Sequence, residues 1–199
     1  MSNQQKNRTC DISIRIGGEA GQGMNVISGL LGKVFLRSGF WVFTHHDIMS
    51  RIRGGHNFSQ IRLSTSPMRA ISAQVQILVC LDKNTFNLYK DEIKKVIIFD
   101  PQQVEDEEFK EKKYLPIPLE KIAKEKGGDV RMANSVASGA VLAVLGSSLE
   151  PLLDLLKETF QSKGDNVVNA NLECAREGYQ YAKENFKGEK ICGDISGKK

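Results

Sequence analysis

The fold is decided by the stretch Ile12-Ser13-Ile14-Arg15-Ile16-Gly17-Gly18-Glu19-Ala20-Gly21-Gln22-Gly23. Its first five residues alternate isoleucine with polar side chains, which predicts a β-strand. Four glycines follow within seven residues, directly before a segment with helical periodicity. Glycines at a strand end permit positive φ angles and let a backbone approach its neighbours closely. The stretch therefore predicts a strand-to-helix turn of the kind that opens a Rossmann-like α/β domain.

The rest of the chain alternates predicted strands and helices. Strands are expected at 40–44, 58–63, 75–81 and 96–99, with an extended segment at 114–118. Helices are expected at 24–38, 84–92, 119–126, 135–145, 149–161 and 167–186. The strand at 58–63 alternates polar and apolar residues, so we expect it to be an edge or half-exposed strand. The pattern predicts a three-layer α/β Rossmann-like sandwich with a mostly parallel sheet and a helical C-terminal third.

Length and composition limit the classes of function. The chain has 199 residues, of which 40% are hydrophobic and 26% charged, so we expect one domain at 10–186 between a disordered tail at 1–9 and a flexible tail at 187–199. Segment 1–9 lacks the apolar core of a signal peptide, and no apolar run approaches about 18 residues. We therefore expect a cytoplasmic protein with no membrane partner. The net charge is only +4, and the basic residues form no continuous stripe, so nucleic acid is not an expected partner either.

The metal-binding residue types do not cluster in this sequence. The cysteines are Cys10, Cys80, Cys174 and Cys192. Their wide spacing predicts neither an iron–sulfur nor a zinc site, and we expect them to be free thiols. Cys80 ends an apolar run and is expected in the core. His45, His46 and Asp47 directly follow the strand expected at 40–44. Adjacent residues on a strand point to opposite faces and do not readily share one metal, so we expect these three to be ordinary loop or interface residues.

Two interpretations of the first glycine loop stay open. The N–H groups and dipole of the helix that follows favour an anion such as a phosphate. Alternatively, the glycines only permit close packing of strand, helix and partner subunits. The order G-x-x-G-x-G departs from the dinucleotide fingerprint, and no Gly-Lys-Ser/Thr follows, which argues against an NAD-dependent enzyme and against a P-loop. The candidate binding residues here are Gly18, Gly21, Gln22 and Gly23.

A second loop, Ser50-Arg51-Ile52-Arg53-Gly54-Gly55-His56-Asn57, sets two arginines beside a glycine pair. Guanidinium groups bind phosphate or carboxylate through two parallel hydrogen bonds, and paired glycines permit a sharp turn. Ion pairs with a partner chain explain the arginines equally well. The candidate binding residues of this loop are Arg51, Arg53, Gly54 and Gly55.

Together the two loops resemble the gamma subunit, or gamma domain, of 2-oxoacid:ferredoxin oxidoreductases. The resemblance covers nearly all of 10–186, and the Ile-Arg-Gly-Gly-His-Asn form is most similar to the 2-oxoglutarate branch; pyruvate and indolepyruvate enzymes stay open. Ala20 differs from the glycine of many relatives, and its methyl group narrows the space for a ligand. The other positions that carry the resemblance are 79–82, 115–118, Asn134, Gly139, Phe160, 169–175 and 178–179.

The resemblance implies a role within a larger enzyme. Such enzymes decarboxylate a 2-oxoacid oxidatively, transfer the acyl group to coenzyme A and reduce ferredoxin. Thiamine diphosphate, Mg²⁺ and [4Fe-4S] clusters are expected on alpha, beta and ferredoxin-like delta subunits, because this chain has neither a Gly-Asp-Gly…Asn-Asn pattern nor a cysteine cluster. The chain alone is therefore expected to carry no catalytic residue and no cofactor.

The implied role of this chain is assembly, together with a contact to coenzyme A. The pyrophosphate and 3′-phosphate of coenzyme A are anionic and match both loops chemically. The alternative is a stand-alone module that binds coenzyme A or a nucleotide without catalytic partners. An isolated gamma subunit would expose an apolar interface, so a homodimer of the isolated chain also stays open.

Overall fold

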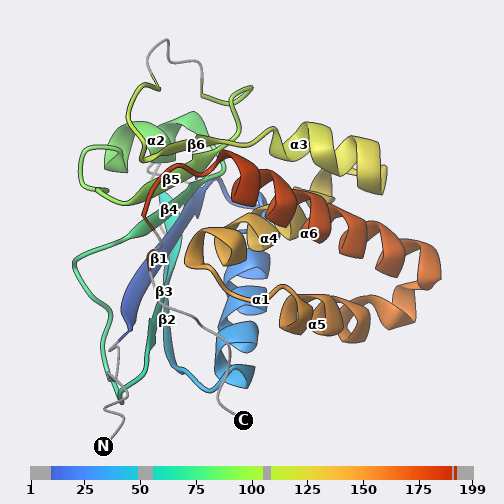
Figure 1. The fold of residues 1–199 in the computed structure, drawn as a ribbon, viewed down its shortest axis with the longest axis horizontal. Coiled ribbons are helices and arrows are strands. Elements are labelled where there is room, and N and C mark those ends of the chain that lie inside the picture. Colours follow the sequence, from blue (N-terminus) through green and yellow to red (C-terminus); the bar gives the residue numbers. More distant parts are fainter. Residues whose placement is uncertain (1–9, 49–55, 105–108, 190, 192–199) are drawn as a thin grey trace, which may run out of the picture.

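The computed structural model describes residues 10–48, 56–104, 109–189 and 191. A six-stranded sheet in the order β2-β3-β1-β4-β5-β6 forms its centre (Figure 1). The strands are β1 (Asp11–Gly18), β2 (Trp41–Asp47), β3 (Asn57–Ser64), β4 (Ile77–Cys80), β5 (Val96–Phe99) and β6 (Tyr114–Pro116). Strands β1, β4, β5 and β6 run parallel, whereas β3 is antiparallel to both of its neighbours. The predicted α/β sandwich with a mostly parallel sheet is confirmed.

Helices cover the sheet unequally. They are α1 (Met24–Arg37), α2 (Lys83–Tyr89), α3 (Leu119–Ile122), α4 (Ala133–Leu145), α5 (Glu150–Phe160) and α6 (Asp165–Asn185). Helices α1, α4, α5 and α6 gather on one side of the sheet (Figure 1). The short α2 packs on the other face, where Phe86 meets Phe99 with ring centroids 5.2 Å apart. Cys80 is buried in this second cluster, as expected.

The strand β1 and the helix α1 follow directly from their sequence periodicities. Ile14 and Ile16 of β1 are fully buried on one face of the sheet. Helix α1 places Ile27 and Leu31, which are spaced by one helical turn, against the same core. Gly39 has a φ of 84° just beyond the helix, as expected for a glycine that ends it.

The crossing of α4 and α6 brings two backbones into direct contact. A Cβ atom added to Gly139 of α4 would overlap the carbonyl oxygen of Ala175, and one added to Gly178 of α6 would overlap that of Val136. Beside this contact, the Ser135 hydroxyl donates to Asn171 Oδ1 at 2.7 Å. The C-terminal third is therefore helical, as predicted, and its two central helices depend on the absence of side chains at these glycines.

The position of β3 differs from the prediction. It lies inside the sheet between β2 and β1, and its polar residues Ser59 and Gln60 are buried. The Ser59 hydroxyl donates to Asn25 Oδ1 at 3.1 Å. Gln60 Oε1 accepts from Arg15 at 3.2 Å, and Gln60 Nε2 donates to the Ser72 carbonyl at 2.7 Å. The alternation predicted an edge or half-exposed strand wrongly, because hydrogen bonds from neighbouring elements satisfy these polar side chains inside the fold.

The helix predicted at 119–126 and the state of the cysteines differ in part from the prediction. The predicted helix at 119–126 begins as α3 and continues as a π-helical turn, Ala123–Gly127. Cys80 and Cys174 are free thiols, whereas Cys10 is disulfide-bonded, so the expectation of a free thiol is wrong there. Sequence spacing does not reveal the three-dimensional proximity that a disulfide needs.

The tail at 1–9 and residues 192–199 lie outside the described residues, and the domain limits stay a prediction. Among the described residues, no helix is both long and apolar enough to span a bilayer.

Candidate functional site

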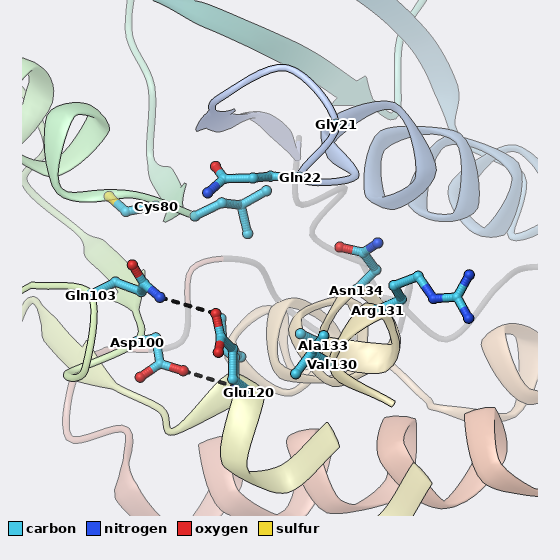
Figure 2. Close-up of a pocket in the computed structure, with 12 residues that line it drawn as sticks. Gly21, Gln22, Cys80, Asp100, Gln103, Glu120, Val130, Arg131, Ala133 and Asn134 are labelled. Atoms are coloured by element: carbon cyan, nitrogen blue, oxygen red, sulfur yellow. Dashed lines mark hydrogen bonds between the residues drawn. The ribbon is translucent and has the colours of Figure 1, made fainter. Parts of the chain in front are cut away.

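The carboxyl ends of β1 and β4 mark the point where the chain connections diverge. After β1 the chain passes through α1 to β2 and β3 on one side, and after β4 it passes through α2 to β5 and β6 on the other. Helices α1 and α2 lie on opposite faces of the sheet. Open α/β sheets bind ligands in the crevice at such a point. A pocket of about 150 Å³ lies here, between the first glycine loop, the ends of β4 and β5, and the starts of α3 and α4 (Figure 2).

The glycines of the first loop have different roles. A Cβ atom at Gly18 would lie 2.6 Å from Gln22 Oε1 and 2.9 Å from Leu81 Cβ, and one at Gly23 would overlap the Asn134 side chain. Gly18 and Gly23 therefore serve close packing. Gly21 has a φ of 98° and faces open space, because a Cβ atom there would meet nothing within 4 Å. Packing thus explains two of these positions, and Gly21 is the one that lines the pocket.

Gln22 closes the turn between β1 and α1. Its Oε1 accepts from the Glu19 backbone N–H at 2.7 Å, and its own N–H donates to the Glu19 carbonyl at 3.2 Å. The side chain thereby extends along the pocket, toward the end of β4 (Figure 2). Helix α1 begins after Gly23 without a side-chain cap. An uncapped helix start presents N–H groups that favour an anion. Ala20 is exposed and has no positive φ.

Two carboxylates line the pocket on the side of β5 and α3. Asp100 follows β5 and is buried; its Oδ1 accepts from the Gln102 N–H and its Oδ2 from the Glu120 N–H, both at 2.9 Å. Asp100 therefore joins the end of β5 to the start of α3. Glu120 Oε1 accepts from Gln103 Nε2 at 3.0 Å (Figure 2). Lys124 Nζ lies 3.9 Å from Glu120 Oε2, so one of the two carboxylates has a cationic partner, and this side of the pocket carries both donors and acceptors of hydrogen bonds.

The start of α4 forms the opposite wall. Val130, Arg131, Ala133 and Asn134 line it. The Arg131 side chain is 87% exposed, and its Nε donates to Asp129 Oδ2 at 2.8 Å. This hydrogen bond lowers the pKa of Asp129 to about 2. The guanidinium of Arg131 points away from Glu120 and Gln103 (Figure 2) and is exposed to solvent, so it does not enter the interior of the pocket.

The second loop is only partly described. Arg51, Arg53, Gly54 and Gly55 lie outside the described residues. The flanks of the loop are Asp47, which ends β2, and Asn57, which begins β3 and pairs in register with Gly18. Both attachment points of the second loop therefore lie at the same end of the sheet as the first loop, the end where β1 stops. The binding role of the two loops stays a prediction.

His56 connects the second loop to α2. Its Nε2 lies 3.4 Å from Thr85 Oγ1, and its ring centroid lies 5.5 Å from that of Tyr89. Burial lowers the pKa of His56; the nearby Asp82 opposes this shift and Arg15 adds to it. His56 is therefore neutral at pH 7.

The side chains of His45 and His46 contact different residues. His46 Nδ1 lies 2.8 Å from Ser59 Oγ, and the His45 ring lies 6.3 Å from that of Phe58. Within the described ranges, no group of three His, Cys, Asp or Glu residues has the arrangement that a metal ion needs.

Sequence reasoning missed several residues of the pocket. Asp100 directly follows the apolar run at 96–99, and the end of a buried parallel strand is a signal for a site. Gln103, Glu120 and Arg131 carry no such signal, because they reach the pocket through the turn after β5, through α3 and through the short helical turn Val130–Met132 before α4. Asn134 contributed only to the family resemblance.

Comparison with known proteins gives consistent matches. The family model "Pyruvate ferredoxin/flavodoxin oxidoreductase" matches residues 13–181. The 2-oxoacid:ferredoxin oxidoreductase subunit alpha of Saccharolobus solfataricus is 31% identical over 88 residues, which are 44% of this chain and 14% of that protein. The 2-oxoglutarate synthase subunit KorC of Methanothermobacter thermautotrophicus is 28% identical over 180 residues, covering 83% of this chain and 95% of that subunit.

A solved structure has the same fold. The 2-oxoglutarate:ferredoxin oxidoreductase from Magnetococcus marinus, with 2-oxoglutarate, coenzyme A and succinyl-CoA bound, matches with a TM-score of 0.79 and 27% identity. The match covers 90% of this chain and 32% of that chain. The chain thus spans a small part of some relatives and nearly all of KorC.

Proposed function

Because the chain belongs to the pyruvate ferredoxin/flavodoxin oxidoreductase family, we propose that it acts as the gamma subunit of a multisubunit 2-oxoacid:ferredoxin oxidoreductase. The observation that carries the proposal is the match over 95% of KorC, a separate subunit of 2-oxoglutarate synthase. The overall reaction converts a 2-oxoacid, coenzyme A and oxidised ferredoxin to acyl-CoA, CO₂ and reduced ferredoxin. The names of KorC and of the Magnetococcus marinus enzyme favour 2-oxoglutarate as the 2-oxoacid.

The redox and decarboxylation chemistry belongs to partner subunits in this proposal. An iron–sulfur cluster needs several cysteine thiolates that converge on one point. Cys80 and Cys174 are buried in different hydrophobic clusters, so they do not fit such a site. We assign thiamine diphosphate, Mg²⁺ and the [4Fe-4S] clusters to alpha, beta and delta subunits, and ferredoxin to a docking site on the assembled complex.

The role that remains for this chain is to support assembly and to bind coenzyme A. The uncapped start of α1 and the open space at Gly21 suit the phosphates of coenzyme A. The exposed guanidinium of Arg131 adds a cation near the same place. Phosphate contacts by Arg51 and Arg53 of the second loop belong to the same proposal.

Reconstitution tests this function. Partner subunits and this chain, mixed in defined combinations, are assayed for ferredoxin reduction that depends on 2-oxoglutarate and coenzyme A. We expect turnover by the complete mixture, and none by this chain alone. Turnover by this chain alone, or undiminished turnover by the partners without it, would contradict the proposal.

A stand-alone binding module is the alternative that the pocket also supports. The pocket is lined by the first glycine loop, the ends of β4 and β5 and the starts of α3 and α4. A module of this kind would bind coenzyme A or a nucleotide with full affinity in the absence of partner subunits. Calorimetric titration of the isolated chain and of the complex separates the two cases, because a subunit is expected to bind more tightly after assembly.

A further inference from the structure

The cysteines of the chain are in different chemical states. Cys80 and Cys174 are free thiols, buried in separate hydrophobic clusters. Cys10, which directly precedes β1, is disulfide-bonded. A disulfide joins two cysteines, and the sequence contains one further cysteine, Cys192. Cys192 lies outside the described residues, so it is identified as the partner of Cys10 by elimination.

The described part of the chain after α6 leads toward Cys10. It turns back from the end of the helix toward the sheet (Figure 1). Phe186 and Ile191 pack against the hydrophobic cluster that contains Cys10. Between them, Glu189 Oε2 lies 3.7 Å from Nζ of Lys95, the residue directly before β5. The segment therefore reaches both the core around Cys10 and the start of a parallel strand.

The separation between these points suits a cross-link. β1 and β5 run parallel with β4 between them, so Cys10 and Lys95 lie at the same end of the sheet. Neighbouring strands are about 4.8 Å apart, which separates β1 from β5 by about 10 Å. The chain from residue 189 to residue 192 can span about 10 Å when it is extended. The place of Cys192 in the sequence is thus compatible with a bond to Cys10.

We propose that Cys10 and Cys192 form a reversible disulfide that ties the C-terminal segment, residues 186–192, to the start of β1. Cys10 is a fixed anchor for this bond. It is 6% exposed, its N–H donates to Thr65 Oγ1 at 3.2 Å, and its carbonyl accepts from the Thr65 N–H at 3.0 Å. The ion pair of Lys95 with Glu189 is exposed on both sides and contributes little to holding the segment.

Such a bond responds to the redox state of its compartment, because disulfides inside cells are usually transient and redox-sensing. A dithiol reduces it by thiolate attack on one sulfur. The Sγ–Sγ bond breaks, the two cysteines receive two electrons and two protons, and the dithiol becomes a disulfide. The segment is then held by the apolar contacts of Phe186 and Ile191 and by the weak ion pair. Oxidation fixes the segment and reduction releases it, whether or not the chain is assembled with partner subunits.

Peptide mapping tests which cysteines are joined. The full-length chain is equilibrated with oxidised glutathione, denatured, alkylated without a reductant, digested and analysed by mass spectrometry. We expect alkylation of Cys80 and Cys174, and a linked pair of peptides that carry Cys10 and Cys192. Alkylation of Cys10 and Cys192, a glutathione adduct on either, or a bond from Cys10 to a second copy of the chain would overturn the proposal.

Hydrogen exchange of the amides at 186–191 tests whether the bond holds the segment. We expect exchange in the folded chain to become at least about tenfold faster after reduction with dithiothreitol. Cys192→Ser should show the fast rate without a reductant. Cys174→Ala is the matched control, because it also removes a cysteine but leaves the bond intact, so it should keep the slow rate. Equal exchange in the oxidised and reduced chain would overturn the proposal.

Discussion

The contact between α4 and α6 makes a quantitative prediction for the substitution Gly139→Ala. The added methyl group would overlap the carbonyl oxygen of Ala175 and lie 3.1 Å from the backbone N of Tyr179. These are backbone atoms of a helix, so they move only if the two helices separate. Such overpacking costs about 1–3 kcal/mol, whereas alanine gains up to about 1 kcal/mol in helix propensity over glycine. We expect the free energy of unfolding to fall by about 1–2 kcal/mol.

Gly29→Ala is the control for this prediction. Gly29 lies in α1, and a Cβ atom there would meet nothing within 4 Å. The same substitution should therefore raise the free energy of unfolding by about 0.5–1 kcal/mol. Urea denaturation of the full chain, followed by circular dichroism, measures both values. An unchanged or higher stability of Gly139→Ala would refute the inference that the two backbones touch.

Two further predictions concern the first loop and the second. Gly23→Ala should destabilise the chain more than Gly21→Ala in urea denaturation, because both positions have positive φ angles but only the methyl group at Gly23 would overlap Asn134. Equal losses would contradict this packing role. The pKa of His56 is lowered in the folded chain, so the unfolded chain binds its proton more readily, and stability should be lost as pH falls below about 6.5. His56→Gln should lose less stability than the unsubstituted chain between pH 7.5 and 5.5; an equal loss would exclude His56 as a cause.

The parts of the fold that depend on local periodicity were predictable. The isoleucines of β1 and the apolar stripe of α1 bury the residues that their spacing indicates. The place of β3 was not predictable in this way. Its polar side chains pair with Asn25, Arg15 and Ser72, which come from other elements, and a local pattern does not contain these partners.

The site was predictable only where it coincides with a loop motif. Gly21 and Gln22 stand out in the sequence because glycines surround them. Glu120 and Arg131 lie about a hundred residues further along the chain and reach the same pocket through the topology of the sheet. They are also surface residue types that occur throughout the chain. Their role becomes visible only when the ends of β1, β4 and β5 are placed side by side.

The proposed function makes this chain one subunit of a larger oxidoreductase. Affinity purification of the tagged full-length chain from its native host, followed by mass spectrometry, tests it most directly. We expect subunits with a thiamine diphosphate site and with iron–sulfur cysteine motifs to be recovered together with the chain, in a constant ratio through size-exclusion chromatography. Recovery of the chain without such subunits would contradict the account and favour a stand-alone binding module.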